Sequence, residues 1–454
     1  MEKSETYLSL LIPRLAMVLF GAFVISILLY AAGIKSPFEW DEILFARAVE
    51  HYDAATNSPH MPGYPAFVLA TRIVALAVHD AVKAVQITSL IAAVLALILV
   101  FITARKLGLE FFRACLASAV VALCPCFLWF SGTGLSDAAG ALSCCAVFWA
   151  VLHGGRSLRW TVLTGVLAAL AVGIRSQAIY VLAPLSVVAL IEWRTKTPLR
   201  LVTAAGAAFL TSVAIWLPAI LLTGPSRWWA AFLWQLQWVR QERINGLALP
   251  YAKWAWIEQG WFIRPFGTAW LAAFFWLSAT AGAIILWRSG RRRIVLYCLG
   301  VGSVSLLLTM FSLDLRNGSR YILPSLVFFS FLIAGGTGGS RWRGRLMAGA
   351  TALFMIGSVA WVFPGLALRR SESSPVIRVL EGIRAEYGLK DANVLYEEKL
   401  WHHTEWMLGR EGYEIHTMSE LEEWSRTHQK DLRSIVAICS HRGSTAEDAA
   451  FRAE

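Results

Sequence analysis

Long runs of apolar residues, separated by short polar stretches, fill the chain from about residue 15 to residue 370. A helix needs about 20 apolar residues to cross a bilayer, and about eleven of the runs approach this length. The run at residues 66–78 is shorter, carries Arg72 and follows Pro65, so it fits an interfacial or re-entrant helix better than a span. The pattern predicts a polytopic α-helical membrane protein with spans at residues 15–34, 84–104, 114–130, 137–153, 160–174, 177–192, 201–223, 266–287, 294–312, 320–338 and 346–368.

The polar stretches differ in charge from one side of these spans to the other. If residues 66–78 do not cross, every basic cluster lies on the side of the N-terminus, which is the cytoplasmic side by the positive-inside rule; if they do cross, the clusters face outward. We adopt the first arrangement, with a cytoplasmic N-terminus in the inner membrane. The first run lacks a small-residue cleavage site, so we expect no signal peptide. The basic clusters are at residues 105–113, 156–159, 194–200, 288–293 and 341–345, and the outer loops are at 35–83, 131–137, 224–265 and 313–320.

The composition changes to charged and polar at residue 371. We therefore predict two domains, a membrane module at residues 1–370 and a small soluble α/β domain outside the cytoplasm at residues 371–454. Helical periodicity alternates there with short strand-like runs. The expected helices are at 375–387, 400–408 and 419–428, and the expected strands at 393–396, 413–416 and 434–438.

The overall composition limits the function classes. The chain has 454 residues, of which 57% are hydrophobic and 16% charged, with a net charge of +11. Because the basic residues mark loops between spans, the charge reports topology and no nucleic-acid partner follows from it. The seven cysteines lie mostly inside apolar runs, so neither a disulfide framework nor a zinc site is expected.

An acidic pair, Asp41-Glu42, follows the first span. Carboxylates beside a bilayer are costly to desolvate, which makes the pair a candidate for function. If a helix begins here, adjacent side chains diverge by about 100° and do not both reach one substrate atom. Asp41 and Glu42 are both candidates for catalysis, and this divergence favours a role for Glu42 at the helix entry or in support of the site. The alternative is that both only favour the first turn of a helix through its dipole.

The order of motifs resembles the glycosyltransferases of the GT-C fold that use lipid-linked sugars, the group of protein O-mannosyltransferases and aminoarabinose transferases. Asp41-Glu42 with Phe45-Ala46 is similar to their D-E-x-x-Y/F-A motif, and residues 60–65 stand in the place of K-P-P-L-x-Y. Ser136-Asp137 begins a span, residues 228–261 are rich in tryptophan, and Arg320-Tyr321-Ile322-Leu323-Pro324 resembles R-Y-x-x-P.

This resemblance implies a GT-C fold and transfer of a sugar from a polyprenyl-phosphate donor to a lipid, glycan or protein acceptor at the outer face, with inversion. Asp41 would take the proton of the acceptor. Asp137 would position a substrate, although an N-cap explains it equally well. No cofactor is required; a divalent cation between Asp41 and Asp137 is an alternative, but the sequence supplies no further oxygen ligands for it.

Cationic side chains would hold the departing phosphate. The candidates are Arg320 with Tyr321, from the R-Y-x-x-P match, and Arg175 with Gln177, from a polar turn between two spans; Arg240 lies in the tryptophan-rich segment. Snorkelling to the interface is the alternative for each arginine, and an aromatic belt for the tryptophans.

The motif at residues 60–65 departs from the family pattern, because His60-Met61 replaces the lysine and Gly63 the second proline. This departure weakens the case that the motif binds phosphate. His60 and Tyr64 remain candidates for phosphate binding, but we prefer a role for this stretch in shaping the turn.

Two other classes of function compete with the enzyme. A lipid flippase or transporter would place functional charges near the middle of the bilayer. The third class is a scaffold that displays the tail domain. The enzyme requires Asp41, Asp137 and one of Arg175 or Arg320 to line one cavity, whereas the scaffold does not.

Overall fold

The computed structural model describes residues 21–155, 157–193, 197–245, 250–313, 315–338, 341–387, 393–396, 407, 415–417 and 435–438. The chain forms two compact units, one of residues 1–34 and 44–371 and the other of residues 35–43 and 372–454. The boundary falls inside helix α2 (Trp40–Glu50).

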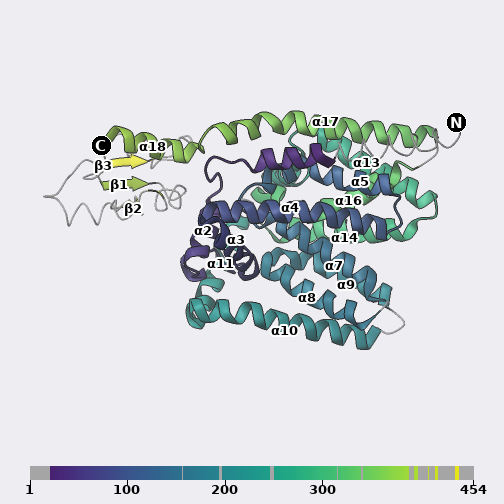
Figure 1. Cartoon of the computed structure of the whole chain (residues 1–454), viewed down its shortest axis with the longest axis horizontal. Helices are drawn as coiled ribbons and strands as arrows, with labels where there is room; N and C mark the ends of the chain where they lie inside the picture. The colour runs from purple at the N-terminus through teal and green to yellow at the C-terminus, as the bar shows by residue number, and fades with distance from the viewer. Residues whose placement is uncertain are drawn as a thin grey trace. The chain divides into compact units, whose positions relative to one another are not determined.

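The first unit is helical throughout its described part (Figure 1). Its elements are the helix Gly21–Ala32, most of α2, η1 (Ala54–Thr56), α3 (Pro65–Val78), α4 (Ala81–Lys106), α5 (Phe111–Ala122), α6 (Pro125–Ser131), α7 (Asp137–Gly154), α8 (Leu158–Ile174), η2 (Ser176–Ala178), α9 (Ile179–Trp193), α10 (Thr197–Thr223), α11 (Pro225–Asn245), α12 (Pro250–Ile257), η4 (Glu258–Ile263), η5 (Arg264–Phe266), α13 (Ala269–Arg288), α14 (Arg292–Ser312), η6 (Leu315–Asn317), α15 (Gly318–Tyr321), α16 (Leu323–Gly336) and α17 (Arg341–Ser371).

Helix α16 is the core of this unit. All of its residues are buried, as expected for a helix that is apolar on every side, and it packs against α5, α7, α13 and α14. A row of α4, α7, α8 and α10 lies beside it, in that order of contact (Figure 1). Only 6% of the apolar stretch Pro198–Thr223 in α10 is buried, so this helix offers an apolar surface to lipid.

The expected membrane character is confirmed. The described residues contain seven helices that are long and apolar enough to cross a membrane, or eight if the bent pair α5 and α6 forms one span. Three of the eleven expected spans coincide with shorter helices, Gly21–Ala32, Leu158–Ile174 and Leu323–Gly336, and Pro65–Val78 is also short. In the part of the chain that the structure describes, each of the eleven expected spans therefore coincides with a helix or, at residues 114–130, with the bent pair.

The expected span at residues 114–130 is not one straight helix. Its two parts, α5 and α6, meet at an angle of 70°. Pro125 begins α6 and Cys124 before it has extended backbone, because proline lacks an N–H for the helix and disfavours helical geometry in the residue before it.

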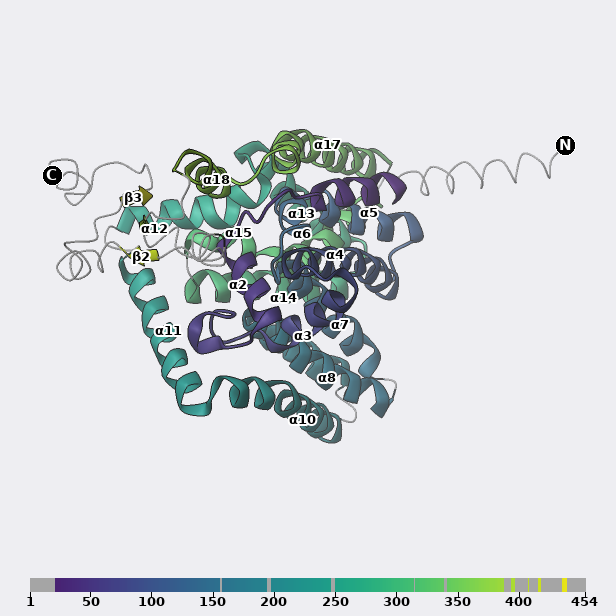
Figure 2. The same cartoon turned by 60° about the vertical axis from the view of Figure 1, so that its left-hand side comes forward.

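The segment at residues 224–265, expected as an outer loop, is largely helical. It contains α11 and α12, and Figure 2 shows α11 leaving the end of α10 after a sharp turn. Gly224 makes this turn with φ of 87°, a conformation that glycine adopts readily. The mixture of tryptophans with Gln and Arg hid the helical pattern in the sequence.

The connection between α2 and α3, residues 51–64, is held against the junction of α10 and α11. Asp53 accepts from Arg227 at 2.7 Å, and the indole of Trp228 donates to the carbonyl of Pro62 at 3.3 Å. The hydroxyl of Tyr52 donates to the carbonyl of Gly63 at 3.0 Å. Burial raises the pKa of the Tyr52 hydroxyl above its ordinary value, with nearby Arg72 opposing the shift, so Tyr52 stays protonated and keeps donating at neutral pH.

The second unit contains the start of α2, helix α18 (Pro375–Tyr387) and a parallel sheet of three strands. Strand β1 (Asn393–Tyr396) lies between β2 (Ile415–Thr417) and β3 (Ile435–Ile438). These elements coincide with the expected helix at 375–387 and, within two residues, with the three expected strands. The expected helices at 400–408 and 419–428 lie outside the described residues. That this region forms a soluble domain outside the cytoplasm stays a prediction.

The turn at Gly63 gives a test of the fold. Gly63 has φ of 116°, and a Cβ there would lie 2.3 Å from the Tyr52 hydroxyl. Gly63→Ala should therefore lower stability by about 1–3 kcal/mol, measured as thermal unfolding in detergent. The control is Gly206→Ala in α10, where nothing lies within 4 Å of the added Cβ; it should not be destabilising. Equal stability of Gly63→Ala and wild type would contradict this account.

Candidate functional site

One buried carboxylate in the first unit holds two arginines. Asp137 is the first residue of α7, and its side chain is 0% exposed. Arg175 Nη2 lies 2.9 Å from Asp137 Oδ1. Arg320 approaches the other oxygen, with both Nη2 and Nε 3.3 Å from Oδ2. The structure thus brings together three of the residues singled out in the sequence, from three separate segments.

The backbone around Arg175 explains how it reaches Asp137. Helix α8 ends at Ile174, and Arg175 has extended backbone, with φ of −152° and ψ of 111°. Its side chain then crosses Gly140, one turn into α7, where a Cβ would lie only 2.8 Å from Arg175 Cδ. Arg175 Nη1 also donates to the hydroxyl of Ser136 at 3.1 Å. A small residue at position 140 is therefore a condition for the ion pair.

Aromatic rings form a second wall of the cluster. The Arg175 guanidinium lies 5.7 Å from the centre of the Tyr321 ring, within reach of a cation–π interaction. Trp261 lies on the other side of this ring, with 5.9 Å between ring centres. Gly318 leaves room for Trp261, because a Cβ there would lie 2.6 Å from its indole nitrogen. That nitrogen is buried and makes no hydrogen bond to any residue that the structure describes.

Two guanidinium groups, 4% and 13% exposed, lie against one carboxylate in a region of low dielectric. Such a place favours a bound anion. Both oxygens of Asp137 accept from arginine, so this carboxylate is arranged to orient the guanidinium groups.

Asp41 and Glu42 belong to the second unit, and both are buried, at 7% and 0% exposure. The Glu42 carboxylate accepts from the backbone N–H groups of Phe38 at 2.6 Å and Glu39 at 3.0 Å. It therefore satisfies donors at the start of α2, the task expected of a residue of helix entry. Asp41 lies in the same first turn.

His60 and Tyr64 lie together in the turn before α3. His60 Nε2 is 3.0 Å from the Tyr64 hydroxyl, and both rings pack against Phe45. Tyr64 precedes α3 with φ of 46°, and Pro65 begins the helix. These contacts give the Pro62 to Pro65 stretch a role in shaping the turn.

The two remaining candidates lie in other elements of the first unit. Gln177 is in η2, where its amide oxygen accepts from Ser176 at 3.3 Å. Arg240 is exposed on α11. Among the described residues, no group of three or more His, Cys, Asp or Glu side chains is arranged to hold a metal ion.

Sequence reasoning missed Gly140, Gly318 and Trp261. The two glycines admit Arg175 and Trp261, and nothing in a single sequence marks which glycine is approached by a side chain from elsewhere. Trp261 was included only as one tryptophan of an aromatic segment. Its neighbour Gly260, which lies against the backbone of Leu315, is the local signal for close packing.

No family model and no curated protein sequence matches the chain. Solved structures match its fold. ArnT from Cupriavidus metallidurans bound to undecaprenyl phosphate superposes with a TM-score of 0.54 and 12% identity, over 92% of this chain and 89% of that one. The oligosaccharyltransferase of Archaeoglobus fulgidus, in complex with zinc and sulfate, superposes with a TM-score of 0.50 and 13% identity, over 86% of this chain. The chain has the GT-C fold.

The chain spans 61% of the length of the oligosaccharyltransferase but 89% of that of ArnT. The GT-C fold expected from the sequence is thereby confirmed at low identity. In this GT-C fold the Asp137 cluster is built from the start of α7, the end of α8 and the short helix before α16.

Removal of the shared carboxylate tests the cluster. Asp137→Asn leaves two buried guanidinium groups without their anion, so we expect a loss of about 3–5 kcal/mol in the free energy of unfolding. The double variant Asp137→Asn, Arg175→Gln should recover part of this loss, because one of the two uncompensated charges is then gone. Unfolding in detergent by heat or denaturant measures both. A fully additive pair of losses would show that the two side chains do not interact.

Proposed function

We propose that the protein is an integral membrane glycosyltransferase that transfers a sugar from a polyprenyl-phosphate donor to a lipid, glycan or protein acceptor. The observation that carries this proposal is the pair of arginines on one buried carboxylate inside a GT-C fold. A neighbour of the same fold, ArnT, was solved bound to undecaprenyl phosphate. The cluster therefore supplies what a lipid phosphate requires, charge-assisted donors in a region poor in water.

The leaving group determines the task of the arginines. As the bond between C1 of the sugar and the phosphate oxygen breaks, its electrons pass to the phosphate, whose negative charge grows. Arg320 and Arg175 would stabilise this charge, while Asp137 holds both guanidinium groups in place. The indole N–H of Trp261 adds support, because a buried donor costs free energy until a bound group accepts from it.

The acceptor must lose a proton as it attacks C1. We assign the proton to the carboxylate of Asp41, on the strength of its place in the D-E-x-x-Y/F-A motif. Products are then the glycosylated acceptor, a polyprenyl phosphate and protonated Asp41. Inversion at C1 follows from a single displacement.

The proposed orientation follows from charge. With the N-terminus and the basic clusters in the cytoplasm, the start of α7 and the end of α8 face the periplasm, where lipid-linked sugars and their acceptors would meet. We assign the protein to the inner membrane on the same argument.

Binding of the lipid product tests the arginines. Undecaprenyl phosphate should bind the purified protein, and Arg320→Gln should weaken binding at least about tenfold, the scale of one charge-assisted contact. Arg320→Lys keeps the charge but not the paired donors, so an intermediate loss is expected. The control is Arg288→Gln, at the exposed far end of α13, which should bind as wild type does. Unchanged binding by Arg320→Gln would remove the phosphate from this cluster.

Turnover tests the reaction and its base. Purified protein is supplied with polyprenyl-phosphate sugars and with lipid, glycan and protein acceptors, and transfer is measured by mass spectrometry of the products. Asp41→Asn should lower kcat by about 10²-fold or more, while binding of undecaprenyl phosphate stays near that of wild type. Full turnover by Asp41→Asn would assign the base elsewhere. Movement of the lipid across vesicles without transfer would instead show a flippase.

A further inference from the structure

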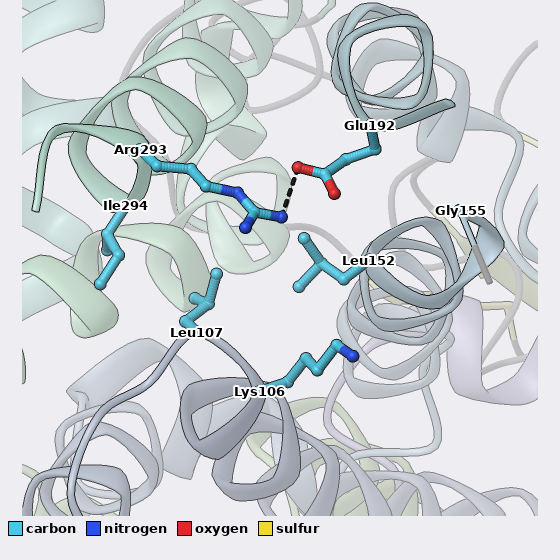
Figure 3. A pocket seen from close by; sticks show the side chains of 7 residues that line it. All are labelled: Lys106, Leu107, Leu152, Gly155, Glu192, Arg293 and Ile294. Carbon is cyan, nitrogen blue, oxygen red and sulfur yellow. Dashed lines mark hydrogen bonds and ion pairs between the residues drawn. The ribbon is translucent and has the colours of Figure 1, made fainter. Parts of the chain in front are cut away.

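A cavity of about 350 Å³ lies at the other end of the membrane unit from Asp137 (Figure 3). It is bounded by the ends of α4, α7 and α9 and by the start of α14, through residues such as Lys106, Leu152, Glu192 and Arg293. Helix α7 has 18 residues from Asp137 to Gly154, and at 1.5 Å per residue its two ends are about 27 Å apart. The cavity is therefore separate from the Asp137 cluster.

Two cations enter the cavity from different helices. Lys106 is the last residue of α4, and Arg293 is the second residue of α14. Arg293 Nη2 lies 2.5 Å from Glu192 Oε1, and the hydroxyl of Tyr297 donates to the same oxygen. Glu192 thus fixes the direction of the Arg293 side chain and balances one positive charge, and Lys106 adds a second one.

A third cation lies behind the wall. Arg200 is only 7% exposed, and its Nη1 would lie 3.8 Å from a Cβ at Gly155, a residue of the cavity wall. Among the described residues, three positive side chains and one carboxylate therefore line or adjoin the cavity. Cationic donors from three helices favour an anionic ligand.

The rest of the wall is apolar. Leu107 and Leu152 lie between the charged side chains, and Ile294 lines one side (Figure 3). A free anion gains nothing from these three side chains, whereas a molecule with an anionic head and aliphatic chains can use both parts of the wall. The position at the ends of membrane-crossing helices also suits a ligand that resides in the bilayer.

We propose that this cavity binds the phosphate headgroup of an anionic phospholipid. The cations Lys106 and Arg293 would contact the phosphate, while Leu107, Leu152 and Ile294 would contact the glycerol backbone and the start of the acyl chains. Basic pockets between transmembrane helices at the cytoplasmic surface recognise anionic lipids in this way, and two of the basic clusters, residues 105–113 and 288–293, adjoin the cavity. The proposal does not depend on the proposed sugar transfer.

Lipid binding to the whole protein tests the site. Delipidated protein in a neutral detergent is titrated with phosphatidylglycerol and, separately, with phosphatidylcholine, and bound lipid is counted by native mass spectrometry. We expect one tightly retained phosphatidylglycerol and weaker phosphatidylcholine. Each cation removed should weaken binding about fivefold, from about 1 kcal/mol per Lys or Arg near a membrane surface. Lys106→Gln should therefore lose about fivefold, and Lys106→Gln with Arg293→Gln about 25-fold.

The matched control is Arg292→Gln, which removes the same charge from the neighbouring exposed residue outside the cavity wall and should leave the tight site unchanged. If the double variant does not fold, Lys106→Gln against Arg292→Gln decides alone. Equal loss in these two variants, or equal binding of the two lipids, would overturn the proposal.

Competition experiments with inorganic phosphate and with glycerol phosphate identify the source of the anion. If glycerol phosphate binds as tightly as the lipid, the ligand is a free phosphate compound and the lipid assignment is wrong.

Discussion

The buried ion cluster of Asp137, Arg175 and Arg320 is the constraint on which the membrane unit depends. Removing charges from water costs several kcal/mol for each ion, and only close pairing offsets this cost. The three side chains come from the start of α7, the end of α8 and the turn before α16, so these three segments must stay together.

The two ends of α7 use related chemistry in different surroundings. At one end a carboxylate that is fully buried accepts from two guanidinium groups. At the other end Glu192, 13% exposed, accepts from a tyrosine and from an arginine that is 62% exposed. Screening by water weakens the second set of charges, which suits a reversible contact with headgroups. The first set keeps its full field, which suits stabilisation of charge that appears during a reaction.

The sequence predicted those parts of the structure that depend on local pattern. Apolar runs gave the helices, and strand-like runs gave β1, β3 and most of β2, because burial imposes a period that a single chain displays. The break at Pro125 and the helices α11 and α12 were missed: the apolar run continued across the proline, and the tryptophan-rich segment has no apolar stripe. Arg175 and Asp137 were both named from the sequence and expected to line one cavity, but their direct ion pair was not predicted, since pairing depends on tertiary contacts such as the approach across Gly140.

Three acidic residues were named from the sequence, and the structure separates their tasks. Asp137 uses both oxygens to orient arginines. Glu42 accepts from two backbone N–H groups at the start of α2. The proposed assignment of the proton to Asp41 rests on its place in the D-E-x-x-Y/F-A motif. The division agrees with the sequence argument that neighbouring side chains in a helix point about 100° apart and do not serve one reacting atom together.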